Sequence, residues 1–290
     1  MAVDLQKLKR KMRGVTSTKQ VTKALQMVSA MKMRKAQEQS EKSRVYRRGL
    51  NELMASFESS PAEAVPELAI VPSGVKTLVV TFASDRGLCG PYNSNTLNAI
   101  RRLGEAKGKD NLEIKAVGIK VGSVLRRRGY KVLANERRPS YAQFGSMIQE
   151  LSRELLALWN TGEYREIRLV YSSLRGMTVL KPEPEIWLPI EASEEENSGA
   201  KSMSASDSFI DEAVTAPVLA QAVRRYLTNE LLTGLLQSEA SEHIARMIAM
   251  DNATRNASEL YSSLQLTYNK ARQAKITQEI CEIVAGANAV

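Results

Sequence analysis

Apolar residues recur three or four positions apart over most of the last part of the chain, from about Val218 to Val284. The stretch contains no proline, and its only glycine is Gly234. This spacing predicts a helix, and its length indicates a coiled coil, a membrane span or a helical repeat. The charged residues spread through it exclude a span. A helix of roughly 100 Å, at about 1.5 Å per residue, is too long for one small domain to cover, so it needs a partner along its length.

A second helical pattern occupies residues 3–58, with no proline before Pro61. The apolar stripe expected to face a partner is Leu5, Leu8, Met12, Val15, Val21, Leu25, Val28 and Met31, followed by Leu50, Leu53 and Phe57. Small side chains at Ala24, Ala30 and Ala36 would let two helix backbones approach closely. Because a whole domain separates the two helical stretches, we predict an antiparallel coiled coil of the N- and C-terminal helices.

The middle of the chain alternates strand and helix patterns. Expected strands cover 78–83, 112–119, 166–174 and 178–190, and expected helices begin at Ser94 or Asn95, cover 120–129, and run from about Tyr141 to Trp159. This alternation predicts a small, largely parallel α/β layer. The fold class is therefore α+β, a long antiparallel coiled coil with an inserted Rossmann-like α/β domain.

The expected domain limits follow from proline and serine content. They are an N-terminal helix at 1–58, a proline-marked linker at 59–75, the α/β domain at 76–190, a flexible acidic and Ser-rich segment at 191–212, and a C-terminal helix at 213–290. Pro217 is expected to mark the start of the last helix, because proline is tolerated in a first turn.

Charge is concentrated in the first helix. The chain of 290 residues has a formal net charge of +9, yet residues 1–48 alone carry fourteen Lys or Arg against three acidic residues. A solvated helix face, a nucleic-acid contact and an acidic protein partner all fit such a stretch. No aromatic residues interleave with these charges for base stacking, and an acidic protein surface is at least as good a partner as nucleic acid.

Candidate chemistry in the middle domain is weak. The turn DRGLCG, Asp85 to Gly90, follows a strand and precedes a helix, as a phosphate-binding turn does, but it matches neither glycine-rich nucleotide motif. We interpret it as a structural turn. Cys89 is expected to be a buried small hydrophobe rather than a nucleophile. The single histidine, His243, is expected at a solvated helix position, and the two cysteines form no disulfide framework.

Five stretches resemble the gamma subunit of F-type ATP synthases of the bacterial type. They are VTKALQMVSAMKMRKAQ at 21–37, DRGLCG at 85–90, SEASEHIARMIAMDNAT at 238–254, YNKARQ at 268–273 and ITQEICEIVAGANAV at 276–290. The resemblance covers essentially the whole chain, in the right order. It implies a rotor shaft with no active site and no cofactor or metal of its own. Its partners would be the alpha and beta subunits of the catalytic hexamer, the epsilon subunit and the c-ring, and not nucleic acid.

The resemblance also implies roles for particular residues. A polar catch on a beta-subunit loop would be Arg272, Gln273 and Thr277. An apolar pivot inside the hexamer would be Ile276, Ile280, Ile283 and Val284. A basic stripe facing acidic segments of the beta subunits would include Lys23, Lys32, Arg34 and Lys35. A foot on the c-ring would be Phe209, Ile210, Asp211 and Glu212.

Two other functions remain as alternatives. A basic coiled-coil scaffold for nucleic acid predicts salt-sensitive DNA affinity, and a nucleotide-binding enzyme predicts nucleotide bound through Gly87 and Gly90. Neither accounts for the C-terminal sequence. The first residues lack the apolar core of a signal peptide. Together with the resemblance, this favours a peripheral membrane protein on the cytoplasmic face of a bacterial inner membrane.

Overall fold

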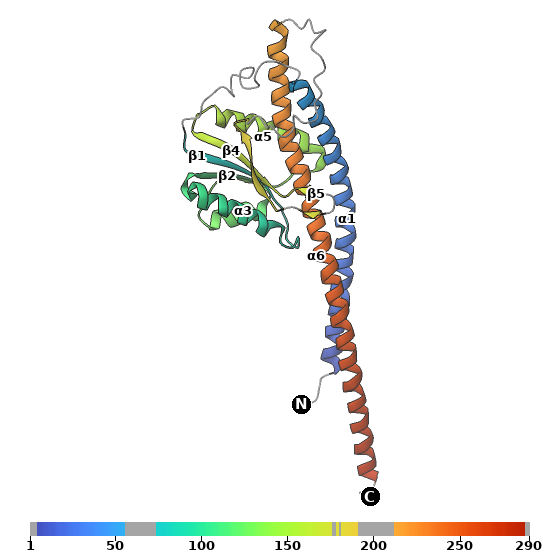
Figure 1. Cartoon of the computed structure of the whole chain (residues 1–290). Coiled ribbons are helices and arrows are strands. Elements are labelled where there is room, and N and C mark those ends of the chain that lie inside the picture. The colour runs from blue at the N-terminus through green and yellow to red at the C-terminus, as the bar shows by residue number, and fades with distance from the viewer. Residues whose placement is uncertain (1–4, 56–73, 176–177, 180, 191–211, 288–290) are drawn as a thin grey trace. The chain divides into compact units, whose positions relative to one another are not determined.

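The computed structural model describes residues 5–55, 74–175, 178–179, 181–190 and 212–287. The chain divides into two compact units, Met1–Met31 with Arg246–Val290, and Lys32–Ala245. Two long helices contribute to both units, α1 (Leu5–Ala55) and α6 (Glu212–Ala287) (Figure 1). The linker expected at 59–75 and the segment expected at 191–212 lie almost wholly outside the described residues.

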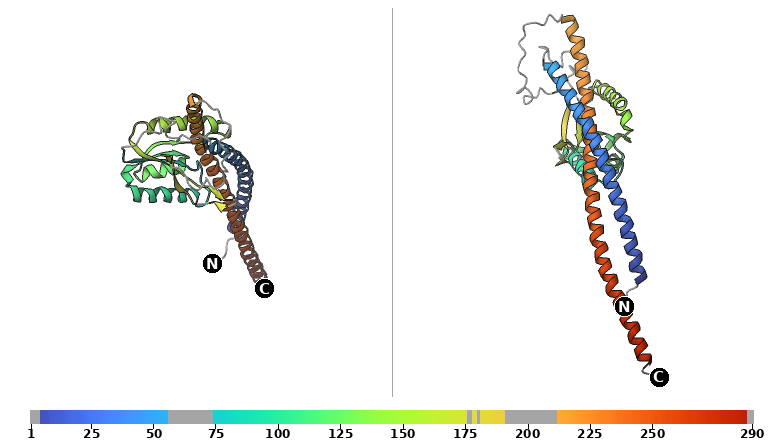
Figure 2. Two further views of the ribbon diagram at one scale, coloured as in Figure 1. Left: turned by 45° about the horizontal axis from the view of Figure 1, so that its top comes forward. Right: turned by 90° about the vertical axis from the view of Figure 1, so that its right-hand side faces the viewer.

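In the first unit, α1 and α6 run side by side in opposite directions (Figure 2). The Thr22 and Thr254 hydroxyl oxygens are 2.7 Å apart, and the Gln26 amide donates to the Asp251 carboxylate at 3.0 Å. The later residue of α1 therefore faces the earlier residue of α6. The antiparallel pairing of the two terminal helices is confirmed.

The expected apolar stripe of α1 is partly buried in this unit at Leu5, Leu8, Met12, Val15 and Leu25, but the expectation is wrong at three positions. Val21, Val28 and Met31 are exposed, whereas Thr22 and Ser29, one position along from Val21 and Val28, are buried. Small hydroxyl side chains let the backbones approach and bond either across the seam, as Thr22 does, or back to their own helix, as Ser29 does to the Leu25 carbonyl. The exposed apolar side chains thus remain available for contacts outside the pair.

The second unit contains a five-stranded sheet in the order β3-β2-β1-β4-β7. Its strands are β1 (Lys76–Phe82), β2 (Leu112–Val117), β3 (Lys131–Glu136), β4 (Tyr164–Tyr171) and β7 (Glu183–Leu188), and a two-residue pair, β5 (Leu174–Arg175) and β6 (Thr178–Val179), stands apart. The first four strands are parallel, and β7 is antiparallel to β4. This order is that of a Rossmann-type half sheet, so the predicted fold class is confirmed.

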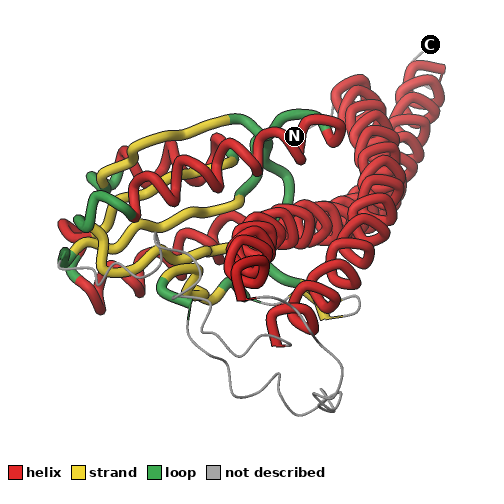
Figure 3. The backbone as a smooth tube through the Cα atoms, turned by 90° about the horizontal axis from the view of Figure 1, so that it is seen from above, coloured by secondary structure: helices red, strands yellow, loops and turns green. Residues whose placement is uncertain are grey.

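Helices cover both faces of this sheet, as the view from above shows (Figure 3). The connecting helices are α3 (Tyr92–Lys107), α4 (Ile119–Arg127) and α5 (Phe144–Trp159), with short turns η1 (Lys109–Asn111) and η2 (Tyr141–Gln143). One core joins α3 and α4 to Val79 and Ile114, and the other joins α5 to Leu78, Val80 and Ile167. The second core also includes α6 through Leu219, Val223, Leu227, Leu231 and Leu235.

Several expected boundaries are corrected. Strand β3 was not predicted, because its apolar run is only three residues long and lies between charged ends on an edge strand. Helix α3 begins at Tyr92 rather than at Ser94 or Asn95, and α6 begins at Glu212, so that Pro217 lies inside its first two turns rather than at its start. Helix α5 begins at Phe144, after the turn η2.

Candidate functional site

The first candidate site is the sheet crevice in which a Rossmann-type fold would bind its ligand. Ligands of open α/β sheets bind beyond the carboxyl ends of the strands, where the strand order reverses, which in this sheet is between β1 and β4. Here α6 packs at those ends. A Cβ added to Gly234 would lie 3.1 Å from the Tyr171 ring and 3.3 Å from the Phe82 ring, so this glycine permits the close approach.

Small polar residues of α6 satisfy the backbone groups at the strand ends. The Ser238 hydroxyl donates to the Phe82 carbonyl at 3.1 Å, and its oxygen lies 2.5 Å from the Tyr92 hydroxyl. The Ser241 hydroxyl donates to the Ser172 carbonyl, just after β4, at 2.9 Å. Such bonds help to satisfy buried carbonyl groups, which are costly to leave without a partner. The helix thus takes the place that a nucleotide occupies in a dinucleotide-binding fold.

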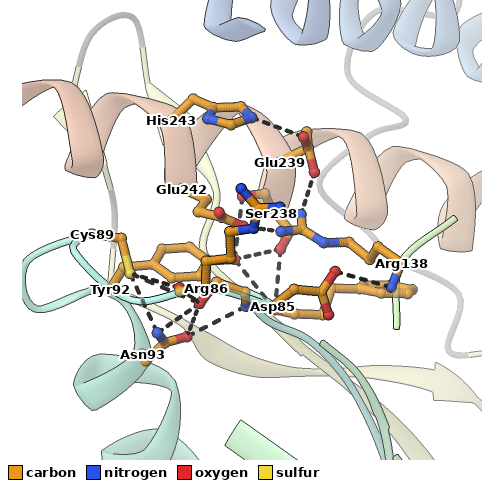
Figure 4. Close-up of polar contacts among 12 residues, drawn as sticks. Asp85, Arg86, Cys89, Tyr92, Asn93, Arg138, Ser238, Glu239, Glu242 and His243 are labelled. Carbon is orange, nitrogen blue, oxygen red and sulfur yellow. Dashed lines mark hydrogen bonds and ion pairs between the residues drawn. The ribbon is translucent and has the colours of Figure 1, made fainter. Parts of the chain in front are cut away.

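A buried ionic cluster lies beside these serines (Figure 4). The Arg138 guanidinium, between β3 and η2, forms ion pairs with Glu239 and Glu242 of α6. The Glu239 carboxylate also contacts His243 Nε2 at 2.9 Å. All four side chains are nearly inaccessible to solvent. We call Arg138, Glu239, Glu242 and His243 the Arg138 cluster.

The charges of this cluster stabilise one another. Burial by itself would raise the pKa of Glu239, but the His243 hydrogen bond and the Arg138 charge outweigh it and lower that pKa to about 2. Lys32 of α1 contributes in the same direction through its charge. His243 is therefore not at a solvated helix position, as its mid-helix place suggested, but is buried and bonded to the residue one turn earlier.

The DRGLCG turn belongs to the same region and is held by structural bonds. The Asp85 carboxylate accepts from the backbone amides of Ile119 at 3.2 Å and Arg138 at 3.3 Å. Cys89 is buried, as expected, and accepts from the Asn93 amide at 3.3 Å. The carboxylate thus ties the turn to the first amide of α4 and to the loop that carries Arg138. This favours the structural interpretation of the turn over a phosphate site.

The second candidate site is the C-terminal end of α6 in the first unit. Extending the Thr22–Thr254 and Gln26–Asp251 register residue by residue places Leu5, the first described residue of α1, opposite Ala271. From Arg272 to Val284 every side chain of α6 is exposed. Among them are Ile276 (46% exposed), Ile280 (55%) and Ile283 (71%).

The exposed end of α6 has two different sides. Ile276, Ile280, Ile283 and Val284 follow the helical spacing of one face. On the other side, Lys275 pairs with Glu279 at 3.6 Å, and the Gln278 amide donates to Glu282 at 2.8 Å. Exposed apolar residues on one face, bounded by charged ones, indicate a surface that another protein covers.

The other site residues expected from sequence are placed as follows. Arg272 and Gln273 are exposed, and the Thr277 hydroxyl donates to the Gln273 carbonyl at 3.0 Å. Lys23, Lys32, Arg34 and Lys35 are exposed, but Lys35 also lies 5.1 Å from the Tyr141 ring centroid. Of the expected foot, Phe209, Ile210 and Asp211 lie outside the described residues, and Glu212 is the first residue of α6.

Sequence reasoning missed the residues that join α6 to the sheet. A signal was present in α6, because polar residues replace the apolar stripe between Leu236 and Ile244, with Ser238 and Ser241 three positions apart and Glu239 and Glu242 likewise. A polar run within an otherwise apolar buried helix indicates specific buried partners. Nothing in the sequence distinguishes Arg138, since it follows Glu136 and Arg137 in a loop and looks like another solvated charge.

Comparison with known proteins decides the family. A family model described as ATP synthase matches residues 4–290. The ATP synthase gamma chain of Pelotomaculum thermopropionicum is 38% identical over 293 residues, covering 99% of both chains, and that of Desulforamulus reducens is 36% identical over 289 residues, covering 98% of both. The chain belongs to the ATP synthase gamma chain family. It is accordingly a central-stalk subunit and not a catalytic one.

Solved structures show the same fold at lower identity. A chain of the Euglena gracilis mitochondrial ATP synthase, in a structure of OSCP, F1 and the c-ring, matches with a TM-score of 0.67 and 20% identity, covering 98% of this chain and 94% of that one. A chain of the Tetrahymena thermophila central stalk and c-ring matches with a TM-score of 0.55 and 22% identity, covering 80% and 99%. Within the described residues of this gamma chain, no helix has the length and apolar character needed to cross a membrane.

Proposed function

We propose that this chain is the central rotor shaft of an F-type ATP synthase. It couples ion-driven rotation of the c-ring to the conformational cycling of the catalytic beta subunits, in ATP synthesis and in hydrolysis. The observation that carries the proposal is the end of α6, where an apolar face of isoleucines is exposed beyond Leu5, the first described residue of α1. Such a face requires a partner, and family membership supplies one in the catalytic hexamer.

The chemistry of that face suits a rotating contact. Hydrophobic contact is non-directional, so Ile276, Ile280, Ile283 and Val284 can turn inside an apolar sleeve without breaking specific bonds. Arg272 and Gln273, about one turn before Ile276, and Thr277, directly after it, would form the polar catch on a beta subunit at particular angles. Rotation would then shift the affinities of the beta sites, because each orientation of the shaft favours a different conformation of the subunit that it touches.

The remaining surfaces would meet the other partners. Lys23 and Arg34, exposed on α1, are suited to acidic segments of the beta subunits, while Lys32 and Lys35 are close to groups of this chain itself. Residues 209–212 would form the foot on the c-ring, with the epsilon subunit beside the α/β domain. The protein would be bound peripherally at the cytoplasmic face of a bacterial inner membrane.

The natural thiol of Cys281 tests the proposal, because it lies in the exposed end of α6 while Cys89 is buried. A bulky maleimide should react quickly with Cys281 in the isolated chain. In the purified ATP synthase, the sleeve of alpha and beta subunits should make the same reaction many times slower. The measurement is the fraction of labelled chain against time on a denaturing gel.

A matched control uses a second thiol on the same background. In a Cys281→Ser chain, Glu105→Cys places a thiol on the exposed side of α3, in the other compact unit. This thiol should react at similar rates in the free and assembled chains. Equal reactivity of Cys281 in the two states would mean that the end of α6 is not enclosed, and the shaft proposal would fail.

A further inference from the structure

The Arg138 cluster joins the α/β domain to α6 with bonds that have direction. Arg138 comes from the loop after β3, and its two ion-pair partners, Glu239 and Glu242, stand three positions apart on α6. We propose that Arg138 is a positioning residue of the rotor, which fixes the angle and height at which the α/β domain grips α6. The proposal rests on the rotor function proposed above.

The packing around the cluster explains why such a residue is needed. Along α6, Leu227, Leu231 and Leu235 contact the sheet through apolar side chains. Contacts of this kind resist separation, but they discriminate weakly between neighbouring rotational settings of a helix. A planar guanidinium that binds two carboxylates on adjacent turns can form both ion pairs at only one rotation and height of the helix, because its N–H donors have a fixed geometry.

Burial makes this geometric requirement strict. The side chain of Arg138 is 7% exposed and that of Glu242 is 4% exposed. Turning or sliding α6 against the domain would separate the buried Arg138 guanidinium from both carboxylates, which is far more costly than losing an apolar contact. The backbone amide of Arg138 is itself bound by Asp85, so the DRGLCG turn fixes the loop that carries the guanidinium.

Three further contacts bring other elements to the same joint. The Ser238 and Ser241 hydroxyls bond the ends of β1 and β4, and Lys35 of α1 lies over Tyr141, three residues after Arg138. Residues of α1, α6 and the sheet therefore all make contacts around the Arg138 cluster. If the c-ring applies torque to the α/β domain and α6 transmits it to the hexamer, the torque passes through these contacts.

Arg138→Met in the whole membrane-bound ATP synthase tests the inference. Two quantities are measured on the same vesicles, the rate of ATP hydrolysis and the membrane potential that hydrolysis generates, reported by a potential-sensitive dye. The assembled variant is expected to hydrolyse ATP near the normal rate but to lose most of the potential generated per ATP. Without the ion pairs, α6 is held to the domain by the leucine core and the serine hydrogen bonds, and it should slip between neighbouring rotational positions when torque is applied.

Lys115→Met is the matched control. Lys115 is as buried as Arg138, 5% exposed, and pairs with Glu154 of α5 and, at 4.0 Å, with Glu136, both of which are about half exposed. Its loss removes a buried, paired charge of the α/β domain whose partners in these ion pairs do not lie on α6. This variant should keep a normal potential per ATP in the complexes that assemble. A merely structural role for Arg138 predicts instead that both variants lower the yield of complex and leave coupling intact, which would overturn the inference.

Two milder variants keep the test decisive if Arg138→Met does not assemble. Glu242→Gln leaves the Glu239 pair in place, and Arg138→Lys keeps the charge but not the fork of donors. Both should lower the potential per ATP by a smaller amount than Arg138→Met. Normal coupling in both would refute the positioning role, whereas the rotor proposal would still stand if the unmodified complex couples normally and encloses Cys281.

Discussion

Replacing Arg272, Gln273 and Thr277 together with alanine is expected to slow ATP hydrolysis by the assembled enzyme at least about tenfold. A charge-assisted hydrogen bond is worth about 1.5–3 kcal/mol, and about 1.4 kcal/mol corresponds to a tenfold change in rate. If the three side chains grip a beta subunit only at certain angles of the shaft, their loss raises the barrier to the step that they assist. The measurement is the turnover rate of purified complex at saturating ATP.

The same substitution should leave the isolated chain intact. Arg272 and Gln273 are exposed, and the Thr277 hydroxyl bonds only the preceding turn of its own helix among the contacts that the structure describes. Exposed substitutions of this kind change the free energy of unfolding by about 0.5 kcal/mol or less. Normal stability with slow turnover would place the defect in the contact with the hexamer.

The opposite side of the same turns provides the control. Lys275, Gln278 and Glu282 are also exposed and lie away from the apolar face. Their joint replacement by alanine should lower turnover much less than the catch substitution does. Equal losses from the two triple variants, or no loss from the first, would contradict the assignment of the catch.

Leu231→Ala is expected to have the largest effect on stability. Leu231 is fully buried in the core that α6 shares with α5 and the sheet. Removing a buried leucine side chain leaves a cavity and typically costs about 2–5 kcal/mol. We expect a loss of about 3 kcal/mol in the free energy of unfolding of the isolated chain, measured by urea denaturation with near-UV circular dichroism.

A second leucine of the same helix is the control for this prediction. Leu266 is 65% exposed on α6, so Leu266→Ala removes the same atoms without forming a cavity. Its effect on unfolding should stay within about 0.5 kcal/mol. Similar effects from both substitutions would mean that the part of α6 near Leu231 does not belong to the domain core.

The sequence was informative where a pattern repeats. The two terminal helices and four of the sheet strands follow from apolar periodicity, because their burial is continuous over many turns or across a whole strand. The edge strand β3 was missed since only three apolar residues, Val132 to Ala134, stand between its charged ends. The seam of α1 was misjudged because Thr22 and Ser29, which are polar, pack where Val21 and Val28 were expected.

Of the two candidate sites, one could be predicted from the sequence and the other could not. The exposed end of α6 was predicted from motif resemblance, and its residues are accessible as that role needs. The Arg138 cluster could not be predicted, because its members are brought together by a loop and a helix about 100 residues apart in sequence. In the sequence these residues look like solvated charges, and only the folded structure shows that they are buried together.

Direct observation of rotation tests the central claim of a shaft. The hexamer would be fixed to a surface, and a bead would be attached through Glu105→Cys on the Cys281→Ser background, since Cys89 is buried. On addition of ATP, the account predicts steady rotation in one direction with one pause for each catalytic beta subunit. A bead that only fluctuates, on complexes that hydrolyse ATP at the normal rate, would contradict it.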